Sequence, residues 1–127
     1  MAARALTSVY DERLKPSGLR STQLAVLWAV VALGDGTVGK IAKTIAMDDS
    51  SLTRTLKLLE RDKLVSLRFG SDRREKQVHA TVRGRRAFSV AMPLWERAQK
   101  DMLKRLRGRR LGEVNSVLLD LSSAQRS

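Results

Sequence analysis

Cysteine is absent from the 127 residues of the chain, and histidine occurs once, at His79. Without cysteine the chain cannot form disulfide bonds, thiolate metal sites or a thiol-based redox sensor. A metal site needs several converging ligands, and the sequence offers His79 no convincing partners. We therefore expect neither a metal site nor a cofactor, and we interpret His79 as a residue on the surface of a strand.

Long apolar runs are also lacking. The apolar stretch 24–33 is shorter than the ~18 residues that a membrane-spanning helix needs. The N-terminal residues have no signal-peptide pattern. The stretch is better interpreted as a buried helix, and we expect a soluble, cytoplasmic protein that does not interact with membranes.

The motifs of common enzyme classes are missing as well. The sequence contains no glycine-rich phosphate loop, no nucleophile elbow and no cluster of histidine with carboxylates. The adjacent Asp48 and Asp49 are best explained as residues at the start of a helix. These absences predict that the chain is not an enzyme.

Positive charge is what the chain has in excess. It carries 25 Lys and Arg against 13 Asp and Glu, which gives a formal net charge of +12. A charge of this size favours a polyanion as the partner. Nucleic acid is therefore the first partner to test against the residue pattern.

Residues 37–61 predict a helix-turn-helix. A short helix over 38–45 is followed by a three-residue turn and a second helix, with Asp48 placed to cap its free N–H groups. At 100° per residue, one side of the second helix holds Leu52, Thr55, Leu56 and Leu59. The other side holds Ser50, Arg54, Lys57 and Arg61. A helix that buries leucines and exposes hydroxyls and cations has the composition of one that lies in a DNA groove, where hydroxyls suit phosphates and base edges.

The residues after this helix predict a β-hairpin. Segment 64–69 alternates at period two, segment 77–81 is the returning strand, and the charged turn between them contains Arg73 and Arg74. A hairpin of this kind directly after a DNA-reading helix is a wing. Arginines at its tip suit the narrow, electronegative minor groove.

Helices are predicted on both sides of this region. They cover 2–15, 22–33 with Ser21 as cap, and 82–107 with Thr81 as cap. Pro93 should kink the longest of these helices, and Gly108 should end it before a final short helix over 111–121. The apolar stripe of the long helix continues for six turns. One small domain cannot cover it, so we expect a second copy of the chain and a two-fold dimer.

The sequence resembles the MarR (multiple antibiotic resistance regulator) family over nearly its whole length. The segments that carry the resemblance are 10–19, 34–42, 47–65, 71–74, 80–84 and 92–99. The first helix looks shortened relative to the family. Arg20 stands where the family has a threonine cap, and Ala80 stands where it has leucine.

The resemblance implies a mainly α fold with a small β-hairpin. The expected parts are an N-terminal dimerisation helix (1–20), a winged helix-turn-helix (21–81) and C-terminal dimerisation helices (82–127), in one structural domain. It also implies a homodimeric repressor that binds a palindromic operator in double-stranded DNA and responds to a small aromatic or phenolic effector.

The family's DNA-contacting positions map onto Ser50, Ser51, Thr53, Arg54, Lys57, Asp72 and Arg74. Arg73, beside them at the tip of the hairpin, is a further candidate for DNA contact. The family's ligand pocket maps onto Tyr10, Leu14, Trp28 and Trp95. In the family, the aspartate at the position of Asp72 steadies the arginine at the position of Arg74 in the minor groove.

Two alternatives remain open on the sequence alone. A charge of +12 would also suffice for a non-specific architectural or nucleoid DNA-binding protein. A winged fold can also serve as a protein-interaction module, which would bind no duplex at all.

Overall fold

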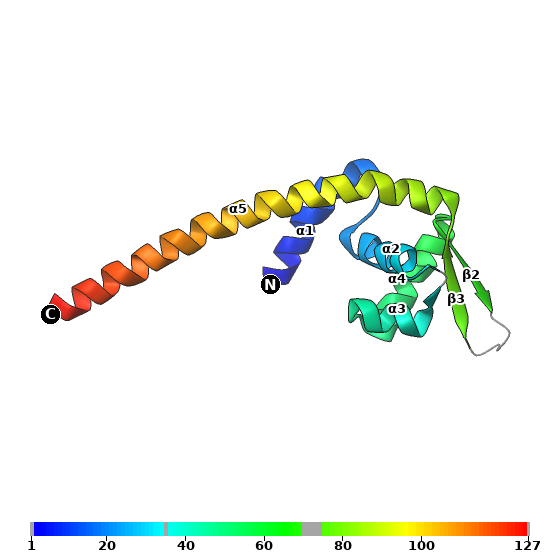
Figure 1. Ribbon diagram of the computed structural model, residues 1–127, viewed down its shortest axis with the longest axis horizontal. Helices are drawn as coiled ribbons and strands as arrows, with labels where there is room; N and C mark the ends of the chain where they lie inside the picture. Colours follow the sequence, from blue (N-terminus) through cyan, green and yellow to red (C-terminus); the bar gives the residue numbers. More distant parts are fainter. Residues whose placement is uncertain (1, 35, 70–74, 127) are drawn as a thin grey trace. The chain divides into compact units, whose positions relative to one another are not determined.

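The computed structural model describes residues 2–34, 36–69 and 75–126, with side chains for 8–34, 36–69 and 75–108 (Figure 1). The chain forms two compact units, residues 1–95 and residues 96–127. Its elements are α1 (Ala2–Leu14), a 3₁₀ turn (Lys15–Ser17), α2 (Ser21–Leu33), β1 (Gly36–Thr37), α3 (Val38–Ile45), α4 (Asp49–Arg61), β2 (Val65–Phe69), β3 (Lys76–Ala80) and α5 (Val82–Arg126).

The three strands form one antiparallel sheet in the order β1-β3-β2. The hairpin of β2 and β3 was predicted, and the mainly α fold with a small β-hairpin is confirmed. Strand β1 was not predicted, because a two-residue strand is too short to show alternation. It is defined by its pairing with β3, where Gly36 lies opposite Val78.

The core of the first unit gathers around α2. The apolar pattern of this helix predicted a central position, and six of its thirteen residues are buried. Helices α1, α3, α4 and α5 and strands β2 and β3 each contribute at least one residue with no more than 2% of its surface exposed. These residues are Leu14, Ile41, Leu52, Leu59, Val65, Val78 and Ala91. Figure 1 shows α2, α3 and α4 grouped beside the sheet, with the β2–β3 hairpin extending beyond them.

The prediction that Ser21 caps α2 was wrong. Ser21 is the first helical residue, and its backbone N–H donates to Oδ1 of Asp11 at 2.7 Å. The backbone N–H of Arg20 donates to Oε1 of Gln23 at 2.9 Å. A carboxylate from α1 therefore binds the N-terminus of α2, where a negative charge is favourable. Asp11 and Ser21 are ten positions apart in the sequence, and this separation hides the cap from local sequence patterns.

Thr81 caps α5 as predicted, and it also joins that helix to the start of β2. Its hydroxyl accepts from the backbone N–H of Gly84 at 3.0 Å and lies 2.7 Å from the carbonyl oxygen of Lys63. The carbonyl oxygen of Leu64 accepts from the backbone N–H of Thr81 at 3.1 Å. The first turn of α5 is thus held against the turn that follows α4.

Helix α5 continues through Gly108 to Arg126, so the predicted break and the separate final helix were wrong. An isolated glycine costs a helix only about 1 kcal/mol relative to alanine. Good helix formers on both sides offset that cost. In addition, no proline or turn motif follows Gly108 to end the helix. Pro93 lies inside the same helix. No helix within the described residues is long and apolar enough to cross a membrane.

Candidate nucleic-acid interface

The N-terminus of α4 is fixed by Asp48, as the sequence predicted. The carboxylate of Asp48 accepts from the backbone N–H of Ser51 at 3.0 Å and from the hydroxyl of Ser50 at 2.6 Å. These hydrogen bonds hold the pKa of Asp48 well below its ordinary value of 3.8, and the bond from the Ser50 side chain has the largest effect. Asp48 is therefore ionised at neutral pH and acts only as an acceptor.

The two faces of α4 are divided as the periodicity predicted. Its buried residues are Leu52, Thr55, Leu56 and Leu59. The opposite face exposes Ser50, Thr53, Arg54 and Lys57, and Ser51 is half-buried beside it. Within the described part of the chain, neither the guanidinium of Arg54 nor the ammonium of Lys57 takes part in a hydrogen bond or ion pair. Both cations are therefore available to a partner.

The turn before α4 determines how this helix is presented. Ala46 adopts a left-handed conformation with φ of 50°, which ends α3 and lets the chain turn within three residues. Ile41 of α3 and Leu52 of α4 are both fully buried in the same core. The two helices are therefore held as one unit, with the basic face of α4 on its outside.

The wing strands pair in one unbroken register. Val65 lies opposite Ala80 at one end, and Phe69 lies opposite Lys76 at the other. Asp72, Arg73 and Arg74 belong to segment 70–74, which lies outside the described residues. The strands that lead into this segment and out of it are both defined.

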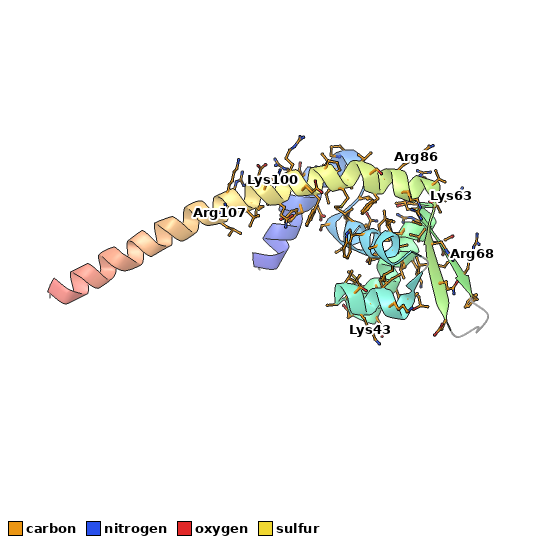
Figure 2. The ribbon with its side chains drawn as sticks, in the orientation of Figure 1. Lys43, Lys63, Arg68, Arg86, Lys100 and Arg107 are labelled. Atoms are coloured by element: carbon orange, nitrogen blue, oxygen red, sulfur yellow. The ribbon has the colours of Figure 1, made fainter. Side chains whose placement is uncertain are left out.

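The structure adds cations that the helix pattern alone did not single out. Lys43 extends from α3 and Arg68 from β2, both away from the core (Figure 2). The ammonium of Lys76 lies 5.8 Å from the centre of the Phe69 ring, and 65% of the Phe69 side chain is exposed. The high net charge was the only sequence signal that pointed to these positions.

An apolar cavity of about 300 Å³ lies on the first unit. Its lining residues are Ser21, Leu24, Ala25, Trp28, Ile45, Met92 and Trp95. The ring of Tyr10 stacks on Trp95 with 6.4 Å between ring centres. Of the four residues proposed for a pocket, Trp28 and Trp95 belong to this lining and Tyr10 and Leu14 do not. Leu14 is instead fully buried in the core.

In the described part of the chain, no group of three or more His, Cys, Asp or Glu residues could hold a metal ion. The arrangement instead offers a basic helix face, an antiparallel hairpin beside it and an apolar cavity. A helix-turn-helix followed directly by such a hairpin defines a winged helix-turn-helix protein.

Comparison with solved structures identifies related proteins. The Mycobacterium tuberculosis transcriptional regulator MosR, solved in complex with DNA, has 37% sequence identity and a TM-score of 0.73. That match covers 89% of this chain and 86% of MosR. A MarR-family regulator from Rhodococcus has 23% identity and a TM-score of 0.73, with 92% of this chain and 84% of that one covered, and shows the shared fold.

Among curated proteins, an uncharacterized HTH-type transcriptional regulator of Bacillus subtilis, YwoH, is 36% identical over 80 residues. That match spans 63% of this chain and 58% of YwoH. No protein-family model matches the sequence. On the similarity to solved regulators over most of its length, the chain belongs to the MarR family of transcriptional regulators.

Proposed function

We propose that this chain is a sequence-specific, double-stranded DNA-binding repressor that acts in the cytoplasm as a homodimer on a palindromic operator. The observation that carries the proposal is the exposed face of α4, with Arg54 and Lys57 beside a hairpin. Arg can grip guanine with two parallel bonds, and the helix diameter fits the major groove. MosR, the relative with 37% identity, has been solved with DNA.

Homodimerisation is supported by apolar side chains that are exposed to solvent in a single copy of the chain. In the second unit, Leu103 and Leu106 lie three residues apart on α5 and are 47% and 52% exposed. Residues at this spacing share one helix face. A second copy that covers such faces by two-fold symmetry would present two α4 helices to successive major grooves, roughly one helical turn (about 10 bp) apart.

The test is selection of bound sites from a pool of random duplexes, followed by competition at physiological salt. We expect a palindromic site that the protein prefers over random duplex by at least ~10³. Equal binding to both would refute the repressor and support the non-specific architectural protein. Absence of duplex binding would support the protein-interaction module. Light scattering should report twice the mass of one chain, and a monomer alone would refute the dimer.

A small aromatic effector is the second part of the proposal. The lining of the cavity contains apolar and aromatic side chains and the Ser21 hydroxyl, but no charged group among the described residues. Such a lining favours an uncharged aromatic or phenolic molecule over an anion.

Trp28 and Trp95, the two tryptophans of the chain, both line this cavity, so intrinsic fluorescence reports directly on it. We expect a neutral phenol to change this fluorescence saturably and to lower operator affinity. The same concentrations should leave the fluorescence of an Ala25→Trp variant, whose added ring fills the cavity, unaffected. An identical response in both proteins would place the ligand elsewhere.

A further inference from the structure

The hydroxyl of Ser50 donates its only proton in a hydrogen bond within the protein. Its Oγ lies 2.6 Å from Oδ2 of Asp48, and the ionised carboxylate can only accept. Ser50 must therefore be the donor in this bond. What the exposed oxygen can still offer to a partner is a lone pair.

The hydroxyl of Thr53, one turn further along α4, also donates its proton within the protein. Its Oγ1 lies 2.7 Å from the backbone carbonyl oxygen of Asp49, which also has no proton to give. Thr53 donates in this bond and keeps only acceptor capacity. Both residues are exposed, so their lone pairs lie on the surface that α4 presents.

The chemistry of DNA limits what two such oxygens can bind. Phosphate oxygens accept only, and so do N7 and O6 of guanine and O4 of thymine. The donors in the major groove are the N6 amino group of adenine and the N4 amino group of cytosine. We infer that Ser50 and Thr53 are specificity-determining acceptors that select adenine or cytosine on the strand facing them, and that neither contacts phosphate. This inference rests on the proposed function.

The neighbouring cations have the complementary chemistry. Arg54 and Lys57 carry donors only, so they suit guanine edges and phosphates. The exposed face of α4 thus places acceptors at 50 and 53 beside donors at 54 and 57. Such a surface distinguishes bases by hydrogen-bond polarity, which charge alone cannot do.

Thr53→Val tests the inference, because valine keeps the shape and the helix propensity of threonine but removes the oxygen. We expect the operator selected by this variant to lose its preference for adenine or cytosine at one position in each half-site. Affinity for the original operator should fall about threefold to tenfold per half-site, the range for one net hydrogen bond. Affinity for random duplex should stay the same.

Thr44→Val is the matched control. Thr44 is also exposed, and its hydroxyl makes the same kind of bond, to the carbonyl oxygen of Lys40 at 2.8 Å, but on α3. This variant should keep every base preference of the wild type. Ser50→Ala should lose a preference at a second position, distinct from the one that Thr53→Val changes.

The possible outcomes distinguish a failure of this inference from a failure of the proposed function on which it rests. A wild-type protein that selects no operator overturns both. A wild type that selects an operator, with unchanged base preferences in Thr53→Val and Ser50→Ala, overturns only the acceptor role. Equal weakening of operator and random duplex by Thr53→Val also overturns it, because that result assigns the hydroxyl to phosphate.

Discussion

Replacing Gly84 with alanine is expected to lower the thermal unfolding midpoint of the protein by about 4 °C or more. An ideal Cβ at this position would overlap the carbonyl oxygen of Leu64 and would lie 2.9 Å from its carbonyl carbon. Real Cβ atoms do not approach backbone so closely, so α5 or the turn after α4 must move. Forcing extra atoms into a packed contact costs about 1–3 kcal/mol or more, and each kcal/mol shifts the midpoint of a domain the size of the first unit by about 4–8 °C.

The surroundings of Gly84 leave little room for relief. The carbonyl oxygen of Leu64 also accepts from the backbone N–H of Thr81, and the Thr81 hydroxyl caps α5 at the backbone N–H of Gly84. Moving the helix away would weaken both bonds. The clash thus outweighs the roughly 1 kcal/mol that alanine gains over glycine in a helix.

Gly39→Ala is the control for this prediction. Gly39 lies in α3, is exposed and has no heavy atom within 4 Å of an added Cβ. The same chemical change should be neutral there, or should raise the midpoint slightly through helix propensity. Differential scanning calorimetry on both variants compares them directly. If Gly84→Ala unfolds at the wild-type temperature, α5 does not approach Leu64 as closely as the structure has it.

The sequence was most informative where local periodicity decides the structure. The faces of α4, the bounds of α3 and the caps at Asp48 and Thr81 were all predicted, because each depends on residues within one or two helical turns. Features that depend on distant residues were missed or wrong. Asp11 binds the N-terminus of α2, and β1 exists only through its pairing with β3.

The prediction about Gly108 failed for a different reason. The prediction treated this glycine as the end of the helix. Its cost of about 1 kcal/mol is too small to stop a long helix, because helix formation is cooperative. For the candidate interface, sequence placed the cations on the exposed face of α4 but did not assign the polarity of the hydroxyls. That polarity depends on which oxygen each hydroxyl donates to, and those partners are seen only in the structure.

Arg54→Ala is expected to remove discrimination at one base pair of each half-site. Arg54 is exposed on α4, and no partner among the described residues holds its guanidinium. A bidentate contact from arginine to guanine contributes about 1–3 kcal/mol of discrimination, so operator affinity should fall about tenfold to a hundredfold per half-site. Competition between the operator and single-base variants measures this loss, and the largest change should fall at one guanine.

Arg54→Lys separates base recognition from charge. Lysine keeps the positive charge but has no planar fork, so the two parallel bonds to guanine are lost. We expect Arg54→Lys to keep the salt dependence of binding, which follows the number of neutralised phosphates, and to lose most of the discrimination at that guanine. Equal behaviour of lysine and arginine would mean that Arg54 acts only through its charge. A preferred sequence and affinity that survive Arg54→Ala unchanged would instead mean that α4 is not the helix that enters the major groove.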